Sequence, residues 1–251
     1  MTQSSDSMAG RVALITGAAH RIGAQIARIL HTNGVSVALH YRNSRSAAES
    51  LKQELEQQRP DSVLLLQAHL DHVEEFPGLI AAIADWRGRL DLLVNNASAF
   101  YPTPLEQADE AQWDDLMASN LKGPFFLARE AAPLLKAHHG CIVNMVDIHA
   151  ERPLKDHPIY SIAKAGNAMM VKSLARELGP EVRVNGIAPG AILWPENDMS
   201  DSVKQEILDR TALGRPGEPD DIARTLLFLF RDAHYVTGQI LAVDGGRSVQ
   251  Q

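Results

Sequence analysis

The sequence contains very little cysteine and has no long apolar run. Cys141 is the single cysteine among 251 residues, so no disulfide can form within the chain, which is typical of proteins from reducing compartments. No segment approaches the roughly 18 consecutive apolar residues of a membrane-spanning helix. The first residues, MTQSSDSMAG, have neither the basic nor the apolar region of a signal peptide. We therefore expect a cytoplasmic protein with no membrane partner.

Positive charge is in deficit, and patterns of metal ligands are lacking. The 24 Lys and Arg residues face 31 Asp and Glu residues, for a net charge of -7, so the chain offers no general attraction to nucleic acid. None of the ten histidines stands in a set spaced like metal ligands, so we expect no metal site. Hydrophobic residues make up 45% of the chain, which is enough for one sizeable core. We expect a single domain over 1–251, with a polar N-terminal tail over 1–9.

Apolar segments of strand length alternate with segments of helical periodicity along the chain. The expected strands cover 12–17, 35–41, 62–67, 90–97, 140–146, 182–188 and 239–245. Their nearly continuous Val, Ile and Leu content is typical of strands that helices cover on both faces. This order predicts an α/β fold, a Rossmann-type doubly wound parallel sheet of seven strands with helices on both faces. Because ligands bind beyond the carboxyl ends of such strands, the irregular region 189–217 is predicted to be a substrate loop.

The segment ALITGAAHRIG, residues 13–23, indicates a strand, a glycine turn and a helix in succession. Gly17 permits a tight turn, and Gly23 allows the helix to pack closely against the sheet. The start of the helix offers N–H groups and the positive end of its dipole to a pyrophosphate. The first strand-to-helix junction is therefore predicted to bind a dinucleotide.

The residues after the second strand indicate which dinucleotide. NAD enzymes usually have an acid about 20 residues after the glycine turn, where it binds the ribose. Here the first acid is Glu49, and Arg42, Ser44 and Arg45 precede it. A guanidinium with neighbouring hydroxyl donors suits a 2′-phosphate. We therefore predict NADPH as the cofactor.

Tyr160 and Lys164 are four residues apart and share one face of a predicted helix. An ammonium beside a phenol would lower the phenol pKa and make Tyr160 a better proton donor. Thirteen residues upstream stands an acid, Asp147. A carboxylate would oppose the oxyanion of a carbonyl substrate but suits a C=N bond, whose nitrogen needs a proton. The other interpretation of Asp147 is a cap for the loop after the fifth strand.

Together, TGAAHRIG, NNAS, Asn120, Tyr160-x-x-x-Lys164 and APG resemble the short-chain dehydrogenase/reductase family over essentially the whole chain. Within that family, Arg21 in the glycine turn, Phe100 after NNAS and Asp147 are similar to the pteridine reductase branch, which includes dihydromonapterin reductases. The resemblance implies a catalytic set of Asn120, Asp147, Tyr160 and Lys164. It also implies that Phe100 stacks on the flat pterin ring and sandwiches it against the nicotinamide.

The resemblance further implies the residues around each ligand. The cofactor would contact Gly17, His20, Arg21, Ile22, Tyr41, Arg42, Asn43, Ser44, His69, Leu70, Asn95, Ala97, Lys164, Pro189, Gly190 and Ile192. The substrate would contact Arg21, Ser98, Phe100, Asp147, Tyr160 and Trp194. His69 departs from the family, in which an aspartate commonly meets the adenine.

The expected activity is NADPH-dependent reduction of a C=N bond in a dihydropterin, a pterin or a folate. A 3-oxoacyl or other carbonyl reductase of the same fold is the alternative enzyme, and an NADP-sensing protein is the alternative outside catalysis. The segment 109–137 has more apolar surface than one sheet face needs, and relatives are commonly tetramers, so we expect a homotetramer.

Overall fold

The computed structural model describes residues 8–193 and 200–249. Its centre is a parallel sheet of seven strands in the order β3-β2-β1-β4-β5-β6-β7. The strands are β1 (Val12–Ile15), β2 (Ser36–Tyr41), β3 (Val63–Gln67), β4 (Leu92–Asn95), β5 (Cys141–Met145), β6 (Arg183–Pro189) and β7 (Ile240–Val243). The predicted doubly wound α/β fold is thus confirmed.

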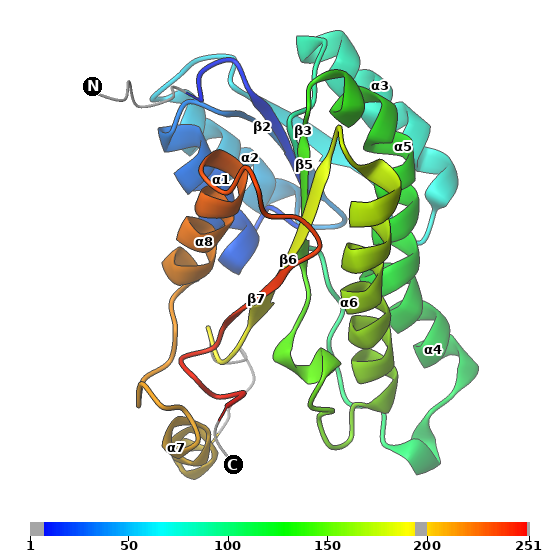
Figure 1. The fold of residues 1–251 in the computed structure, drawn as a ribbon, viewed down its shortest axis with the longest axis vertical. Helices are drawn as coiled ribbons and strands as arrows, with labels where there is room; N and C mark the ends of the chain where they lie inside the picture. Colours follow the sequence, from blue (N-terminus) through cyan, green and yellow to red (C-terminus); the bar gives the residue numbers. More distant parts are fainter. Residues whose placement is uncertain (1–7, 194–199, 250–251) are drawn as a thin grey trace.

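Helices cover both faces of the sheet, so the fold has three layers, with the sheet in the middle (Figure 1). One layer holds α1 (Arg21–Thr32), α2 (Arg45–Glu56) and α8 (Pro219–Arg231). The other holds α3 (Phe76–Arg87), α4 (Glu110–Met117), α5 (Gly123–Ala137) and α6 (Pro158–Leu178). The short α7 (Asp201–Asp209) lies near the carboxyl ends of the strands, at the bottom of Figure 1. No helix among the described residues is both long and apolar enough to cross a bilayer.

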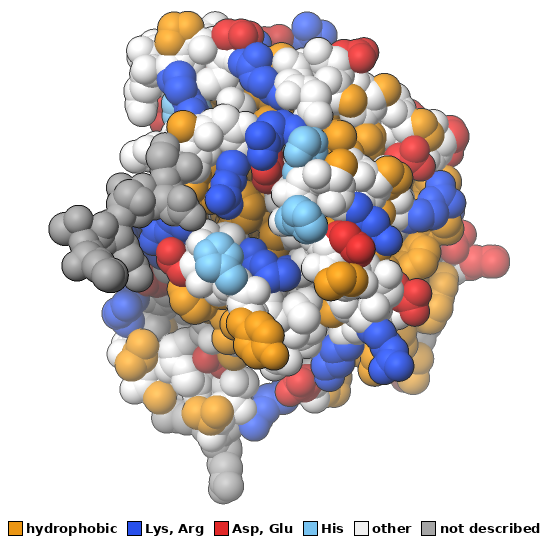
Figure 2. Space-filling view, turned by 45° about the horizontal axis from the view of Figure 1, so that its top comes forward, with side chains coloured by type: hydrophobic (Ala, Val, Ile, Leu, Met, Phe, Trp, Pro, Cys, Tyr) orange, Lys and Arg blue, Asp and Glu red, His pale blue; other side chains and the backbone are white. Residues whose placement is uncertain are grey.

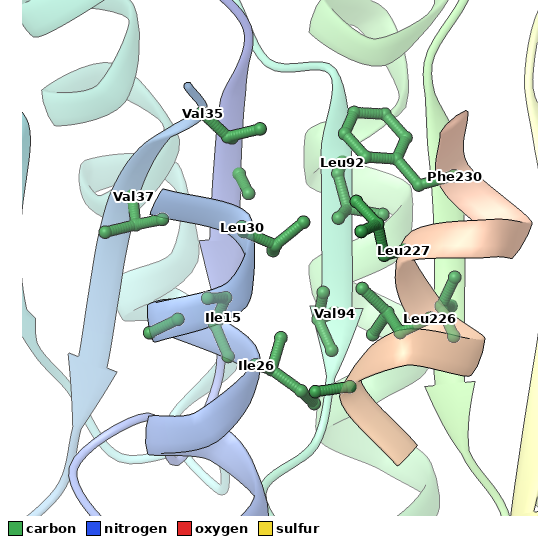
Figure 3. Close-up of a cluster of buried hydrophobic side chains, with 14 of the residues drawn as sticks. Ile15, Ile26, Leu30, Val35, Val37, Leu92, Val94, Leu226, Leu227 and Phe230 are labelled. Atoms are coloured by element: carbon green, nitrogen blue, oxygen red, sulfur yellow. The ribbon is translucent and has the colours of Figure 1, made fainter. Parts of the chain in front are cut away.

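Alternate residues of each strand enter two separate cores, as the apolar runs predict. In β1, Ala13 and Ile15 pack toward α1 and α8, whereas Val12 and Leu14 pack toward the opposite layer. Figure 3 shows the first of these cores, where side chains such as Ile26 of α1 meet strand residues and α8. Burial on both faces explains why these strands are apolar throughout.

Two arginines near the amino ends of the strands hold the carbonyls at helix ends. Arg59 donates to the carbonyl oxygens of Gly34 and Val35, just after α1. Arg183 donates to Leu229 and Phe230 in the last turn of α8. A positive charge at a helix carboxyl end is stabilising. In Figure 2 the amino ends of the strands are turned toward the reader, and Lys, Arg and His side chains gather there around a shallow hollow.

Helices α5 and α6 present large apolar side chains to solvent. Phe125 of α5 is 42% exposed, and Ile162 and Met169 of α6 are 50% and 61% exposed. Because Ile162 and Met169 are seven residues apart, they lie on one face of α6. The predicted subunit interface over 109–137 falls on the same layer of helices, and it stays a prediction.

Candidate active site

The candidate site contains a cavity of about 390 Å³ beyond the carboxyl ends of β1 and β4. Of the residues predicted to contact ligands, it is lined by Gly17, His20, Arg21, Ile22, Arg42, Leu70, Ala97 and Ser98. These residues come from four separate stretches of the chain. The topology therefore gathers the glycine turn, the end of β2 and the end of β4 around one space.

The glycine turn and the end of β4 are joined by hydrogen bonds. The Thr16 hydroxyl oxygen accepts from the backbone N–H groups of Asn96, at 2.9 Å, and Ala97, at 3.0 Å. The Asn96 amide donates to the Thr16 carbonyl at 2.8 Å. Gly17 has a φ of 61°, and a Cβ there would come within 2.9 Å of the Ala97 Cα. Glycine is thus required at this turn by both backbone conformation and space.

His40 supports the turn, and its role was not predicted from the sequence. Its Nδ1 accepts from the Gly17 N–H at 3.3 Å, so the proton is on Nε2, which donates to the Ala68 carbonyl at 3.1 Å. Burial lowers the pKa of His40 to about 4, and the bond to Ala68 opposes this shift. The neutral imidazole therefore ties the turn to β2 and to the end of β3. An isolated histidine in an apolar strand gave no signal of this role.

Arg21 adopts a backbone conformation that is uncommon for a side chain of its type. Its φ is 51°, in the left-handed region, which costs a residue other than glycine about 1 kcal/mol or more. From the start of α1 its guanidinium donates to the Leu193 carbonyl at 3.5 Å. Such strain is concentrated at functional sites. Arg21 thus connects the glycine turn with the predicted substrate loop.

The two arginines after β2 are in different surroundings. Arg42 is exposed and lines the cavity, and no described acid forms an ion pair with it. Arg45 donates from Nε to Glu49 at 2.8 Å, one helical turn away along α2. Ser44 precedes α2 and makes no side-chain cap. Arg42 is therefore the guanidinium that is best placed for a phosphate at the mouth of the cavity.

Several predicted contacts lie outside the residues that line this cavity. They are Tyr41, Asn43, Ser44, His69, Asn95, Lys164, Pro189, Gly190 and Ile192. His69 is half-buried, stacks on His72 with ring centroids 5.3 Å apart, and approaches Asp71 at 3.8 Å. The Asn95 side chain is buried beneath the end of β4 and donates to Asn144. Predicted cofactor contacts of these residues stay predictions, and Trp194 lies outside the described residues.

Asp147, Tyr160 and Lys164 converge at the carboxyl end of β5. The Tyr160 hydroxyl donates to Oδ2 of Asp147 at 2.7 Å, and the His149 N–H donates to Oδ1 at 2.8 Å. Lys164, buried, donates from Nζ to the Met145 carbonyl at 2.9 Å. One oxygen of Asp147 therefore caps the loop, and the other accepts from the tyrosine, while the predicted role toward a C=N bond stays a prediction.

The predicted direction of the tyrosine pKa shift was wrong. Burial, and after it the Asp147 carboxylate, raise the pKa of Tyr160 well above its ordinary value, while the neighbouring Ser98 side chain opposes the rise. Lys164 lies 5.6 Å from the centre of the tyrosine ring. Burial lowers the pKa of this lysine to about 8, and the Asp147 charge opposes that shift. At neutral pH the phenol is therefore protonated and able to donate.

Asn120 belongs to a π-helical segment, Ala118–Lys122, and its side chain meets Ser98. The Ser98 hydroxyl donates to Oδ1 of Asn120 at 2.6 Å, and the Asn120 amide donates to the carbonyls of Leu116 and Ala99 at 2.9 and 3.0 Å. Ser98 lines the cavity and also lies beside Tyr160, so it stands between the two parts of the site.

Phe100 lies beside Tyr160. Its ring is 51% exposed, and its centroid lies 4.9 Å from that of Tyr160 in an edge-to-face arrangement. His157 stacks on it nearly parallel, with centroids 4.8 Å apart. The histidine backs one side of the phenylalanine, a contact that was not predicted. A flat ring could therefore meet an aromatic surface at this point.

Comparison with known proteins gives one family and relatives of two kinds. A family profile described as "Enoyl-(Acyl carrier protein) reductase" matches residues 17–248. The chain is 37% identical over 238 residues to 3-oxoacyl-(acyl-carrier-protein) reductase FabG of Staphylococcus aureus, which covers 93% of this chain and 96% of that protein. It is 36% identical over 280 residues to pteridine reductase 1 of Leishmania tarentolae, covering 95% and 96%. The identities are nearly equal, so they do not separate the two kinds of substrate.

Proposed function

The chain belongs to the short-chain dehydrogenase/reductase family, and we propose that within it the protein is an NADPH-dependent pteridine reductase. Membership makes the protein an oxidoreductase that uses a nicotinamide dinucleotide. The observation that carries the finer proposal is the 2.7 Å hydrogen bond from Tyr160 to Asp147.

The residues of the cavity fit a dinucleotide. Gly17 leaves room where a Cβ would collide with Ala97, and the N-terminus of α1 follows directly. Arg42 offers a guanidinium, and the absence of any acid between Gly23 and Glu49 favours NADPH over NADH. When bound, the cofactor supplies a hydride. The chain's own residues must position the substrate and supply the proton.

A C=N substrate needs a proton at nitrogen, and Tyr160 holds one at neutral pH. As that proton leaves, a phenolate beside the Asp147 carboxylate would place two negative charges at hydrogen-bond distance. Such a pair is strongly disfavoured in a buried site. Asp147, 2.7 Å away, can take up a proton from solvent and pass it to the tyrosine, so that the proton given to the substrate nitrogen is replaced from water. Asp147 therefore supports repeated protonation of a ring nitrogen.

The surroundings of the tyrosine also suit a flat heterocycle. The aromatic ring of Phe100 lies edge-to-face with Tyr160, and the Ser98 hydroxyl lies nearby. Arg21 reaches across to Leu193 with a planar set of donors that matches ring nitrogen or oxygen acceptors. The preferred substrate class is therefore a dihydropterin, with oxidised pterins and folates as further candidates.

A 3-oxoacyl reductase is the second candidate, and the 37% identity to FabG favours it. Its transition state develops charge on a carbonyl oxygen, which the Asp147 carboxylate would oppose. Steady-state oxidation of NADPH with dihydromonapterin, dihydrobiopterin, dihydrofolate and a 3-oxoacyl thioester separates the two. We expect turnover of at least one dihydropterin. Turnover of the thioester alone would contradict the proposal, and NADPH binding without any turnover would favour an NADP-sensing protein.

A further inference from the structure

Four buried asparagines form a continuous line of hydrogen bonds from the sheet to the active site. Asn95 of β4 donates to Oδ1 of Asn144 on β5 at 2.9 Å, and Asn144 donates to Oδ1 of Asn167 on α6 at 3.1 Å. Asn167 in turn donates to the backbone carbonyl of Asn120 at 2.8 Å. All four residues are at most 3% exposed. Exchange of any one amide for an apolar group would leave buried polar neighbours unpaired.

The direction of this line is set at the Asn120 end. A backbone carbonyl can only accept, so Asn167 must present its NH₂ group to Asn120 and its oxygen to Asn144. The same reasoning fixes the orientation of the Asn144 side-chain amide and then that of Asn95. Its consequence is visible at the far end, because Oδ1 of Asn95 is buried and has no hydrogen-bond partner among the described residues. The line is therefore organised around the Asn120 carbonyl.

The Asn120 carbonyl lacks the partner that a regular α-helix would give it. In a regular α-helix it would accept from the N–H of residue 124, but Pro124 has no N–H. Residues Ala118–Lys122 are π-helical, a local change that is common at functional sites. The Asn167 side chain supplies the missing donor and so fixes this segment.

The Asn120 side chain accepts from Ser98 at 2.6 Å, and the Ser98 side chain lies beside Tyr160. We propose that Asn167 is a positioning residue, whose amide holds the Asn120 backbone so that the Asn120 side chain keeps Ser98 beside Tyr160. The inference deepens the proposed function, because it rests on Tyr160 as the proton donor. Asn167 itself acts only through Asn120.

A double-mutant cycle tests this role. We would measure kcat and KM for Asn167→Ala, Ser98→Ala and the double variant, with Asn167→Ser as a milder change in case the alanine variant does not fold. Asn185→Ala is the matched control, because Asn185 is equally buried, donates to Val236 and accepts from Gln239, and lies outside the line. Thermal unfolding of every variant reports the structural cost.

We expect Asn167→Ala to lower kcat about tenfold, corresponding to about 1.4 kcal/mol, with KM for NADPH unchanged. In the Ser98→Ala background, Asn167→Ala should lower kcat little further, because the Ser98 side chain through which Asn167 acts on Tyr160 is already absent. Asn185→Ala should lower stability similarly and leave kcat nearly unchanged.

Equal kinetic effects of Asn167→Ala and Asn185→Ala would overturn the inference, as would full additivity with Ser98→Ala. If the wild-type protein reduces only a 3-oxoacyl thioester, the proposed function fails, and the cycle is measured on that reaction instead. The two failures are therefore distinguishable.

Discussion

The Tyr160 hydroxyl and the Asp147 carboxylate share a 2.7 Å hydrogen bond at the carboxyl end of β5. The same carboxylate accepts the His149 N–H through its other oxygen. The acid is therefore held in one orientation by the loop that it caps. Under the proposed function, this arrangement favours protonation of a nitrogen over stabilisation of an oxyanion.

Arg42 should determine the preference for NADPH over NADH. Loss of one charge-assisted contact to a phosphate costs about 1.5–3 kcal/mol, so Arg42→Ala should lower the ratio of kcat/KM values for the two cofactors at least tenfold. Arg45→Ala is the control and should change the ratio less, because Glu49 already pairs with Arg45. An unchanged ratio in the Arg42 variant would rule out this role.

Phe100→Ala should weaken pterin binding and leave NADPH binding nearly unchanged. By analogy with base stacking on aromatic side chains, about 1–3 kcal/mol of pterin binding is expected to be lost. Fluorescence titration of each ligand measures this difference. Phe228→Ala, which removes an exposed ring on α8, is the control. Equal losses for both ligands would assign Phe100 to structure alone.

Lys164 should make the stability of the protein rise with pH above about 8. Burial lowers its pKa to about 8 from 10.5, so between these values the unfolded chain binds more protons than the folded one. Burial of the charged Lys164 lowers the free energy of unfolding by about 3 kcal/mol below pH 8, and this loss is relieved as the pH rises. Denaturant unfolding from pH 7 to 10 should show this gain relative to Lys164→Met. Parallel curves for the two proteins would refute it.

We propose that the exposed apolar face of α5 and α6 joins subunits of a homotetramer. Burial of Ile162, Met169 and Phe125 would remove three exposed apolar side chains from water. Sedimentation equilibrium should give a tetramer for the wild-type protein and a smaller species for Ile162→Glu. Leu105→Glu, an exposed site before α4, should leave the mass unchanged. A monomeric wild-type protein would contradict the proposal.

The fold could be predicted because its determinants are local in sequence. Strands covered on both faces are apolar throughout, and each helix carries its own periodic pattern. The ends of the strands were less accurate. The fourth strand was expected to reach residue 97 but ends at Asn95, because the N–H groups of Asn96 and Ala97 bond to the Thr16 hydroxyl instead of continuing the strand.

The site could be predicted only where motifs carry it. Tyr160, Lys164 and Asp147 stand in a recognisable order, whereas His40 and Asn167 act on Gly17 and Asn120, which are 23 and 47 residues away. No local pattern announces such contacts. The pKa of Tyr160 likewise depends on burial and on Asp147, which only the folded chain brings together.

The most direct test of the account is kcat of Asp147→Ser toward a dihydropterin and toward a 3-oxoacyl thioester, with NADPH affinity as the control. Serine can still accept the His149 N–H, so the loop cap is kept while the carboxylate beside Tyr160 is lost. We predict that pterin turnover falls by about ten- to ten-thousandfold, the usual range for a general acid or base, while NADPH binding is unchanged. Near wild-type pterin turnover in this variant would show that Asp147 only caps a loop, and the assignment to pteridines would be contradicted.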